Sequence, residues 1–151
     1  KKLLDKFKTL SEKDPQYKII EDSLMVLMYP TYKGHSLYLI NNTDSTQHYT
    51  GCDSRLNIVA QVKVDTGWAA IEYNPSSWCG NSYHQVYLKS QEYWAFTVPS
   101  YTGKIRSMLR YKLTDGAQII YSNAIACSYN KEQLGKKEGH TANSIMDPYD
   151  E

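Results

Sequence analysis

Alternation of apolar and polar residues through the middle of the chain is the feature that most limits its fold. Over 56–64, five apolar side chains recur at every second position, beginning at Leu56 and ending at Val64. Successive side chains of a β-strand point to opposite faces, so this spacing predicts a strand with one buried face. Further strands are predicted at 36–40, 68–73, 85–88, 93–98, 104–113 and 118–129.

Short turn signals separate these segments. Asp65-Thr66-Gly67 and Asp115-Gly116 are hairpin signals, and Ser90-Gln91 is read as a tight turn of the same series. Seven or eight short strands with such turns between them are typical of a β-sandwich. The sequence therefore predicts an all-β fold, an immunoglobulin-like antiparallel β-sandwich.

The first 29 residues follow other patterns. Apolar side chains at helical spacing predict a short amphipathic helix over 1–10. Asp14-Pro15 suits the start of a second helix, because Asp is a favoured N-cap and Pro a favoured first helical residue. The alternative is a buried first strand over 23–29, ended by Pro30, and we favour the strand.

The end of the chain lacks the strand pattern. Residues 130–151 are polar, with only Leu134, Ile145 and Met146 as apolar anchors. We expect an extended C-terminal tail there. The predicted organisation is an N-terminal arm at 1–29, a β-sandwich domain at 30–129 and a tail at 130–151.

The charge balance restricts the classes of partner. Lys and Arg number 17 against 16 Asp and Glu, which gives a formal net charge of +1. A nucleic-acid-binding domain normally carries a skewed charge, so no nucleic-acid partner is expected. The longest unbroken apolar run, 24–29, is far shorter than the roughly 20 residues that span a bilayer, so no transmembrane segment is expected.

Recognition is expected at the long loops. If neighbouring strands run alternately up and down, the three short turns meet at one end and the loops 42–54, 74–84 and 99–103 meet at the other. Rigid β folds commonly carry recognition on such loops, although long loops can also simply cap a core. The candidate binding residues, which would offer aromatic and polar contacts to a protein or carbohydrate partner, are Trp78, Asn81, Tyr83, His84 and Tyr101.

The three cysteines allow one disulfide and leave one thiol over. Cys52 and Cys79 lie in neighbouring predicted loops, whereas Cys127 falls on the apolar side of a predicted strand. A Cys52–Cys79 disulfide is therefore the expected pairing. The alternative is three reduced thiols, with Cys127 acting as a small buried apolar residue.

Catalytic chemistry at the same loops is an alternative interpretation of the sequence. Cys79 and His84 could act as nucleophile and base in a hydrolase, but such a pair also needs an orienting group and an oxyanion hole. Trp78-Cys79-Gly80 is similar to the start of thioredoxin-type sites, yet Ser82 stands where the second cysteine would be. The His and Cys residues lack the tight spacing of a structural zinc site. No metal or other cofactor is expected.

A basic stripe lies on one predicted strand. Lys104, Arg106, Arg110 and Lys112 share its outward face, interrupted only by Met108. This stripe could bind an anionic partner. Such a face can equally be solvated or paired with acidic neighbours.

Several strings resemble one group of bacterial proteins. They are YNPSSWCGNSYH at 73–84, LINNTD at 39–44, LRY at 109–111, IYSN at 120–123 and IMDPY at 145–149. Together they resemble exported β-sandwich proteins of the Bacteroidetes for which no activity is known. The resemblance implies a location in the periplasm, at the cell surface or outside the cell, and it implies no catalytic residue.

The sequence favours a non-enzymatic binding or adaptor domain of the bacterial cell envelope, which recognises its partner through the long loops. Two alternatives stay open. One is a hydrolase that depends on Cys79 and His84, and the other is an inhibitor or immunity-type protein that occludes another enzyme with the same loops.

Overall fold

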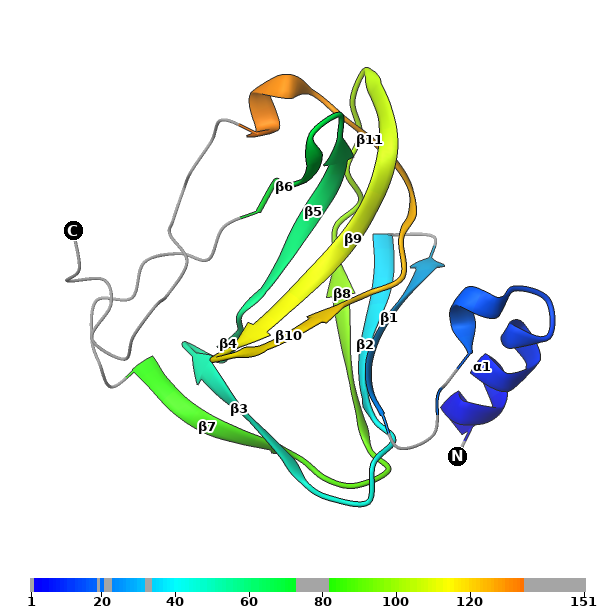
Figure 1. Cartoon of the computed structure of the whole chain (residues 1–151), viewed down its shortest axis with the longest axis vertical. Coiled ribbons are helices and arrows are strands. Elements are labelled where there is room, and N and C mark those ends of the chain that lie inside the picture. Colours follow the sequence, from blue (N-terminus) through cyan, green and yellow to red (C-terminus); the bar gives the residue numbers. More distant parts are fainter. Residues whose placement is uncertain (1, 19, 21–22, 32–33, 73–81, 135–151) are drawn as a thin grey trace.

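The alternating segments form antiparallel strands in the computed structural model (Figure 1). The structure describes residues 2–18, 20, 23–31, 34–72 and 82–134. The strands are β1 (Leu24–Thr31), β2 (Gly34–Asn41), β3 (Gln47–Cys52), β4 (Arg55–Leu56), β5 (Ile58–Val64), β6 (Gly67–Ala70), β7 (Tyr83–Leu88), β8 (Tyr93–Val98), β9 (Ile105–Asp115), β10 (Gln118–Tyr121) and β11 (Ile125–Tyr129). Within these residues, helical structure consists of α1 (Lys2–Ser11), the short 3₁₀ segments η1 (Pro15–Tyr17) and η3 (Lys131–Leu134), and a 3₁₀ residue, Ser82, just before β7. The prediction of a mostly β chain with antiparallel sheets and a short N-terminal helix is confirmed.

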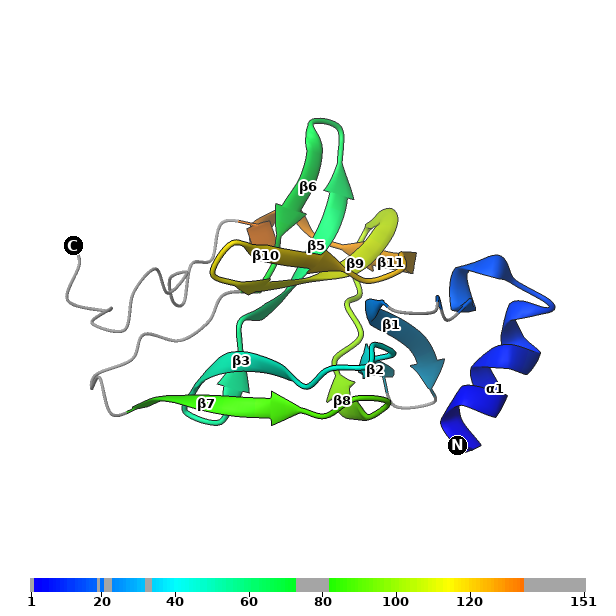
Figure 2. The same cartoon turned by 60° about the horizontal axis from the view of Figure 1, so that its bottom comes forward.

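The strands pair into three sheets. Their orders are β1-β2-β8, β4-β3-β7 and β10-β9-β5-β6, and β11 also pairs with β9. The pairings between these strands are all antiparallel. Figure 2 shows the sheet of β5, β6, β9 and β10 as one layer, with β2, β3, β7 and β8 in a second layer below it.

The second layer is built on one long, bent ribbon. Strand β2 continues into β3, and β7 continues into β8 alongside them, so that Ile40 pairs with Tyr93 and Gln47 pairs with Leu88 on either side of the bend. The fully buried Asn41 holds the bend, because its side-chain amide donates to the Leu88 carbonyl at 3.0 Å.

Two sequence predictions fail at this bend. Residues 42–54 were predicted to be a loop, but they contain β3. Ser90-Gln91 was predicted to be a turn between neighbouring strands, but β7 and β8 pair with β3 and β2 and not with each other. A short turn signal describes local backbone geometry and does not decide whether the chain reverses.

One apolar core lies between the layers. Strands of all three sheets contribute to it, including Leu37 from β2, Tyr49 from β3, Val62 from β5 and Leu109 from β9. Each of these side chains is at most 1% exposed. Alternation in the sequence therefore identifies the buried face of these strands correctly.

The N-terminal segment covers the other side of the sheet of β1, β2 and β8. Phe7 of α1 and Tyr17 of η1 pack with Leu27 and Ile40 in a second, smaller apolar cluster. Asp14 caps η1 by accepting a hydrogen bond from the Gln16 N–H, but the helix that it starts is a single 3₁₀ turn.

Several strand boundaries differ from prediction. The predicted strand at 56–64 is divided, with Leu56 in β4 and Ile58–Val64 in β5 of another sheet, and the predicted strand at 68–73 ends at Ala70 as β6. The predicted strand at 23–29 exists as β1, but it continues through Pro30 to Thr31. An edge strand tolerates a proline, because the missing N–H can face away from the partner strand. The predicted strand at 118–129 is divided into β10 and β11, because Ser122 pairs with Tyr111 through its hydroxyl as well as its N–H.

Candidate functional site

The predicted binding residues do not gather into one described surface. Trp78 and Asn81 lie outside the described residues. Tyr83 and His84 begin β7, opposite Cys52 and Gly51 of β3. Tyr101 lies in the segment between β8 and β9, which Figure 1 places away from the start of β7.

The predicted arrangement of the loops is wrong. Strands β5 and β9 run antiparallel, with Ile58 opposite Leu113. The turns that follow them, at 65–66 and 116–117, therefore lie at opposite ends of the same sheet. The prediction placed both turns at one end because it counted Ser90-Gln91 as a reversal of the chain.

Tyr101 packs against the apolar core and hydrogen-bonds to Glu72. Its hydroxyl donates a hydrogen bond to the Glu72 carboxylate, whose other oxygen accepts from the Ala60 N–H at 3.2 Å. Burial, followed by the hydrogen bond to Glu72, raises the pKa of Tyr101, and burial raises the pKa of the neighbouring Tyr111. These contacts hold Tyr101 against the core, and its role in binding stays a prediction.

The cysteine chemistry also stays a prediction. Cys52 and Cys127 are free, half-buried thiols, and Cys79 lies outside the described residues. Burial raises the pKa of the Cys127 thiol, which makes it less reactive. The His84 ring lies on the exposed start of β7, with its Nδ1 3.2 Å from the Ser82 carbonyl oxygen.

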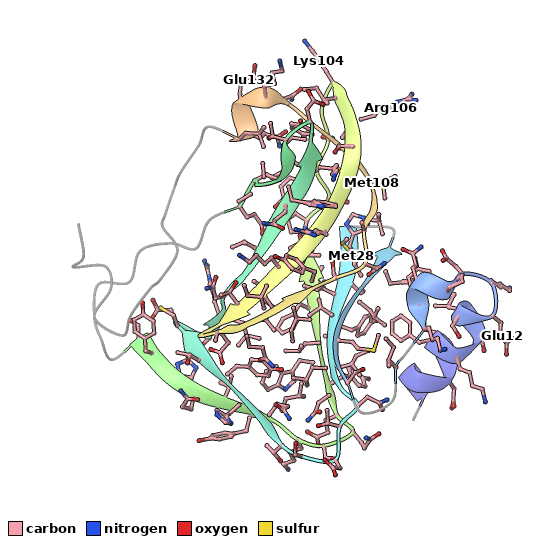
Figure 3. The ribbon with its side chains drawn as sticks, viewed as in Figure 1. Glu12, Met28, Lys104, Arg106, Met108 and Glu132 are labelled. Carbon is pink, nitrogen blue, oxygen red and sulfur yellow. The ribbon has the colours of Figure 1, made fainter. Side chains whose placement is uncertain are left out.

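The outer face of the sheet of β5, β6, β9 and β10 carries the more definite site. The inward residues of β9, among them Leu109 and Tyr111, are buried, which turns Arg106, Arg110 and Lys112 outward. Figure 3 shows Arg106 projecting from the start of β9. The side chains that share this face across the sheet, named here the cationic face, are Lys63, Trp68, Arg106, Arg110, Lys112 and Tyr121.

Arg110 is the centre of the cationic face. The carbon of its guanidinium group lies 4.2 Å from the centroid of the Trp68 ring and 3.9 Å from that of the Tyr121 ring. Its Nε donates to Gln61 Oε1 at 2.9 Å. Lys63 Nζ lies 5.6 Å from the Trp68 centroid. Burial between these groups lowers the pKa of Arg110, but a guanidinium keeps its charge at any physiological pH.

The charges of the cationic face are not neutralised within the described chain. Among the described residues that point outward from these strands and β11, none is Asp or Glu. Asp115 accepts a hydrogen bond from the Thr50 N–H at the end of β9, and Glu72 is held by Tyr101. No salt bridge joins Arg106 or Lys112 to another described residue. The face is therefore a local concentration of positive charge on a chain with little net charge.

Sequence analysis found the basic stripe of β9 but missed its aromatic neighbours. Trp68 reaches the face because it pairs with Lys63 across the predicted hairpin turn, so the turn signal could have placed it there. Tyr121 pairs with Lys112 across the turn after β9. The pairing of β5 with β9, which brings Gln61 to Arg110, has no local signal.

Comparison with known proteins adds no relative: no protein-family model, curated protein or solved structure matches the chain. In the described residues, no three His, Cys, Asp or Glu side chains are grouped so that they could hold a metal ion. None of the described helices has the length and apolar character needed to cross a membrane.

Proposed function

We propose that this chain is a non-enzymatic binding domain and that its cationic face binds an anionic partner. The observation that supports this most directly is the Arg110 guanidinium held between Trp68 and Tyr121, on a face whose described outward strand residues include no Asp or Glu. This surface replaces the long-loop end as the proposed site, because the register of β5 and β9 places the turns at 65–66 and 116–117 at opposite ends of their sheet, and residues 42–54 contain β3.

The geometry of Arg110 favours binding over a purely structural role. A guanidinium stacked on two rings and held at Nε has lost most of its side-chain freedom before a partner arrives. Its other N–H groups can then meet a carboxylate or phosphate in a fork. A single exposed ion pair contributes only about 0–1 kcal/mol, so the face would work through several cations together.

A charge-reversal pair tests the proposal. Arg106→Glu with Lys112→Glu should lower the salt concentration at which the chain elutes from carboxymethyl cellulose at pH 7. The control is Lys13→Glu with Lys89→Glu, which has the same net charge but changes exposed lysines away from the face. Equal elution of the two variants would show that net charge alone governs binding and would contradict the proposal.

We also propose that the two layers form the immunoglobulin-like sandwich predicted from the sequence. If β2–β3 and β7–β8 are each counted as one bent strand, the first layer reads β1, β2–β3, β7–β8 and the second reads β6, β5, β9, β10. In immunoglobulin notation these are A-B-E and C′-C-F-G. Cross-strand NOEs between Ile58 and Leu113 would test the central pair of the second layer.

The proposed place of action is the bacterial cell envelope, in the periplasm, at the cell surface or outside the cell. The support is the resemblance of strings such as 39–44 and 120–123 to exported proteins of the Bacteroidetes. Detection of the chain in the envelope or the medium after fractionation of its source cells would test this location.

A further inference from the structure

We infer that the partner of the cationic face is a linear acidic polysaccharide, a chain of sugar rings that carry carboxylates. The inference rests on the proposed anion-binding function and adds the chemical class of the partner. It is carried by the hydrogen-bonding groups, the spacing of the cations and the apolar surface that lies between them.

The charged groups of the face offer donors and almost no acceptors. The lysine and guanidinium groups can only donate, and Gln61 Oε1 already accepts from Arg110 Nε. Strands β5 and β9 are internal, so their backbone groups are engaged with neighbouring strands. An extended peptide brings N–H donors as well as carbonyls, and its donors would find no partners here. Carboxylates and ring oxygens accept hydrogen bonds, and a sugar hydroxyl can rotate so that it accepts from the face while its own proton points to water.

The cations form a row that suits a chain better than a small anion. Arg106, Arg110 and Lys112 lie on alternate positions of β9, with Met108 in the gap. At about 3.4 Å per residue, the row from Arg106 to Lys112 is roughly 20 Å long. A small anion could reach one or two of these groups, whereas a linear polyanion can contact all of them.

Apolar surface between the cations favours sugar rings. Tyr121 is 46% exposed and Met108 is 39% exposed, although both point outward from the middle of a cationic sheet face. The C–H faces of a sugar ring can pack against such side chains while its carboxylate meets a guanidinium. An inorganic polyphosphate has no apolar surface to place there.

Calorimetric titration with defined oligomers tests this inference. A galacturonate decasaccharide should bind the full chain about tenfold or more tightly than the disaccharide, because only the longer chain spans the row. A neutral dextran fragment of similar length should not bind. Arg110→Lys keeps the charge but loses the fork and should weaken binding of the decasaccharide about tenfold.

Tyr121→Leu and the control Lys89→Glu complete the set. Tyr121→Leu should weaken binding of the decasaccharide several-fold, while its elution from carboxymethyl cellulose stays near that of the wild type. Lys89→Glu should leave the affinity for the decasaccharide within about twofold of the wild-type value. Thermal melts test whether each variant is folded. If Tyr121→Leu does not fold, the double variant Tyr121→Phe with Met108→Ala replaces it.

The outcomes separate the inference from the function on which it rests. If poly-glutamate or oligo-dT of equal charge binds as tightly as the decasaccharide, the face is a general anion site and the inference is wrong, although the proposed function stands. If no polyanion binds, and the charge-reversal pair elutes at the same salt concentration as its control pair, the inference and the proposed function are both wrong.

Discussion

The side-chain amide of Asn123 pairs with both backbone groups of Met28. The Met28 N–H donates to Asn123 Oδ1 at 2.6 Å, and Asn123 Nδ2 donates to the Met28 carbonyl at 3.1 Å. Met28 lies in β1 of one layer, whereas Asn123 follows β10 in the other. The Asn123 side chain therefore pairs with the backbone of β1 as a neighbouring strand would, and it links the two layers along their shared edge.

We predict that Asn123→Ala lowers the free energy of unfolding by about 1–3 kcal/mol, because it leaves two partly buried backbone groups without partners. Urea denaturation measures the loss, and hydrogen exchange should show weaker protection of the Met28 amide. Gln118→Ala, at an exposed position of β10, is the control. A wild-type exchange rate at Met28 in Asn123→Ala would contradict the link between the layers.

Asn41 should be the most sensitive residue of the bent ribbon. Its Nδ2 donates to carbonyl groups of Ser45 and Leu88, and its Oδ1 accepts from the Thr43 N–H and hydroxyl. Asn41→Ala should cost about 3 kcal/mol or more, because several buried groups lose their partners together. Asp44→Ala, at an exposed position in the same bend, should change stability by less than about 0.5 kcal/mol. Similar urea midpoints for the two variants would overturn this account of the bend.

The buried Tyr49 and the partly buried Tyr101 should respond to loss of the hydroxyl in opposite ways. The Tyr49 hydroxyl is buried without a hydrogen-bond partner, so Tyr49→Phe should be neutral or stabilising by up to about 1 kcal/mol. The Tyr101 hydroxyl donates to Glu72, so Tyr101→Phe should destabilise by about 1–3 kcal/mol. Thermal unfolding of the two variants measures both effects, and a larger loss for Tyr49→Phe would contradict the assignment.

Stability should fall in alkaline solution because of the buried Tyr49 phenol. Burial raises the pKa of Tyr49 from 10.0 to about 12 in the folded state. Below pH 10 both the folded and unfolded states keep the proton, so the contribution of Tyr49 is complete. As pH rises from 10 to 12 only the unfolded state ionises, and about 2–3 kcal/mol is lost. Urea midpoints measured between pH 8 and pH 12 should show this fall, and Tyr49→Phe should make it shallower.

The free energy of the contact between Trp68 and Arg110 can be measured separately from the other contacts of the cationic face. A double-mutant cycle with Trp68→Leu and Arg110→Gln should give a coupling free energy of about 0.5–1 kcal/mol, as expected for a partly exposed cation–π pair. Neither single variant removes a fully buried side chain, so both should fold. A coupling near zero would mean that Trp68 does not hold Arg110 in place.

Local chemistry in the sequence determined the type of most elements. Alternation over 56–64 predicted β5 and its buried face, because the pleat gives every second side chain the same environment. Asp65-Thr66-Gly67 predicted the β5–β6 turn, and Asp14-Pro15 marked the start of η1. Each of these signals lies within a few residues of the structure that it specifies.

The tertiary structure decided the bend and the candidate site. Asn41 looks like an ordinary end of a strand until the carbonyl of Leu88 arrives from 47 residues away to meet its amide. Arg110 likewise needs Trp68 and Gln61, which reach it only when β5 pairs with β9. Which strands become neighbours depends on how all the apolar faces are buried together, and no local stretch of sequence carries that information.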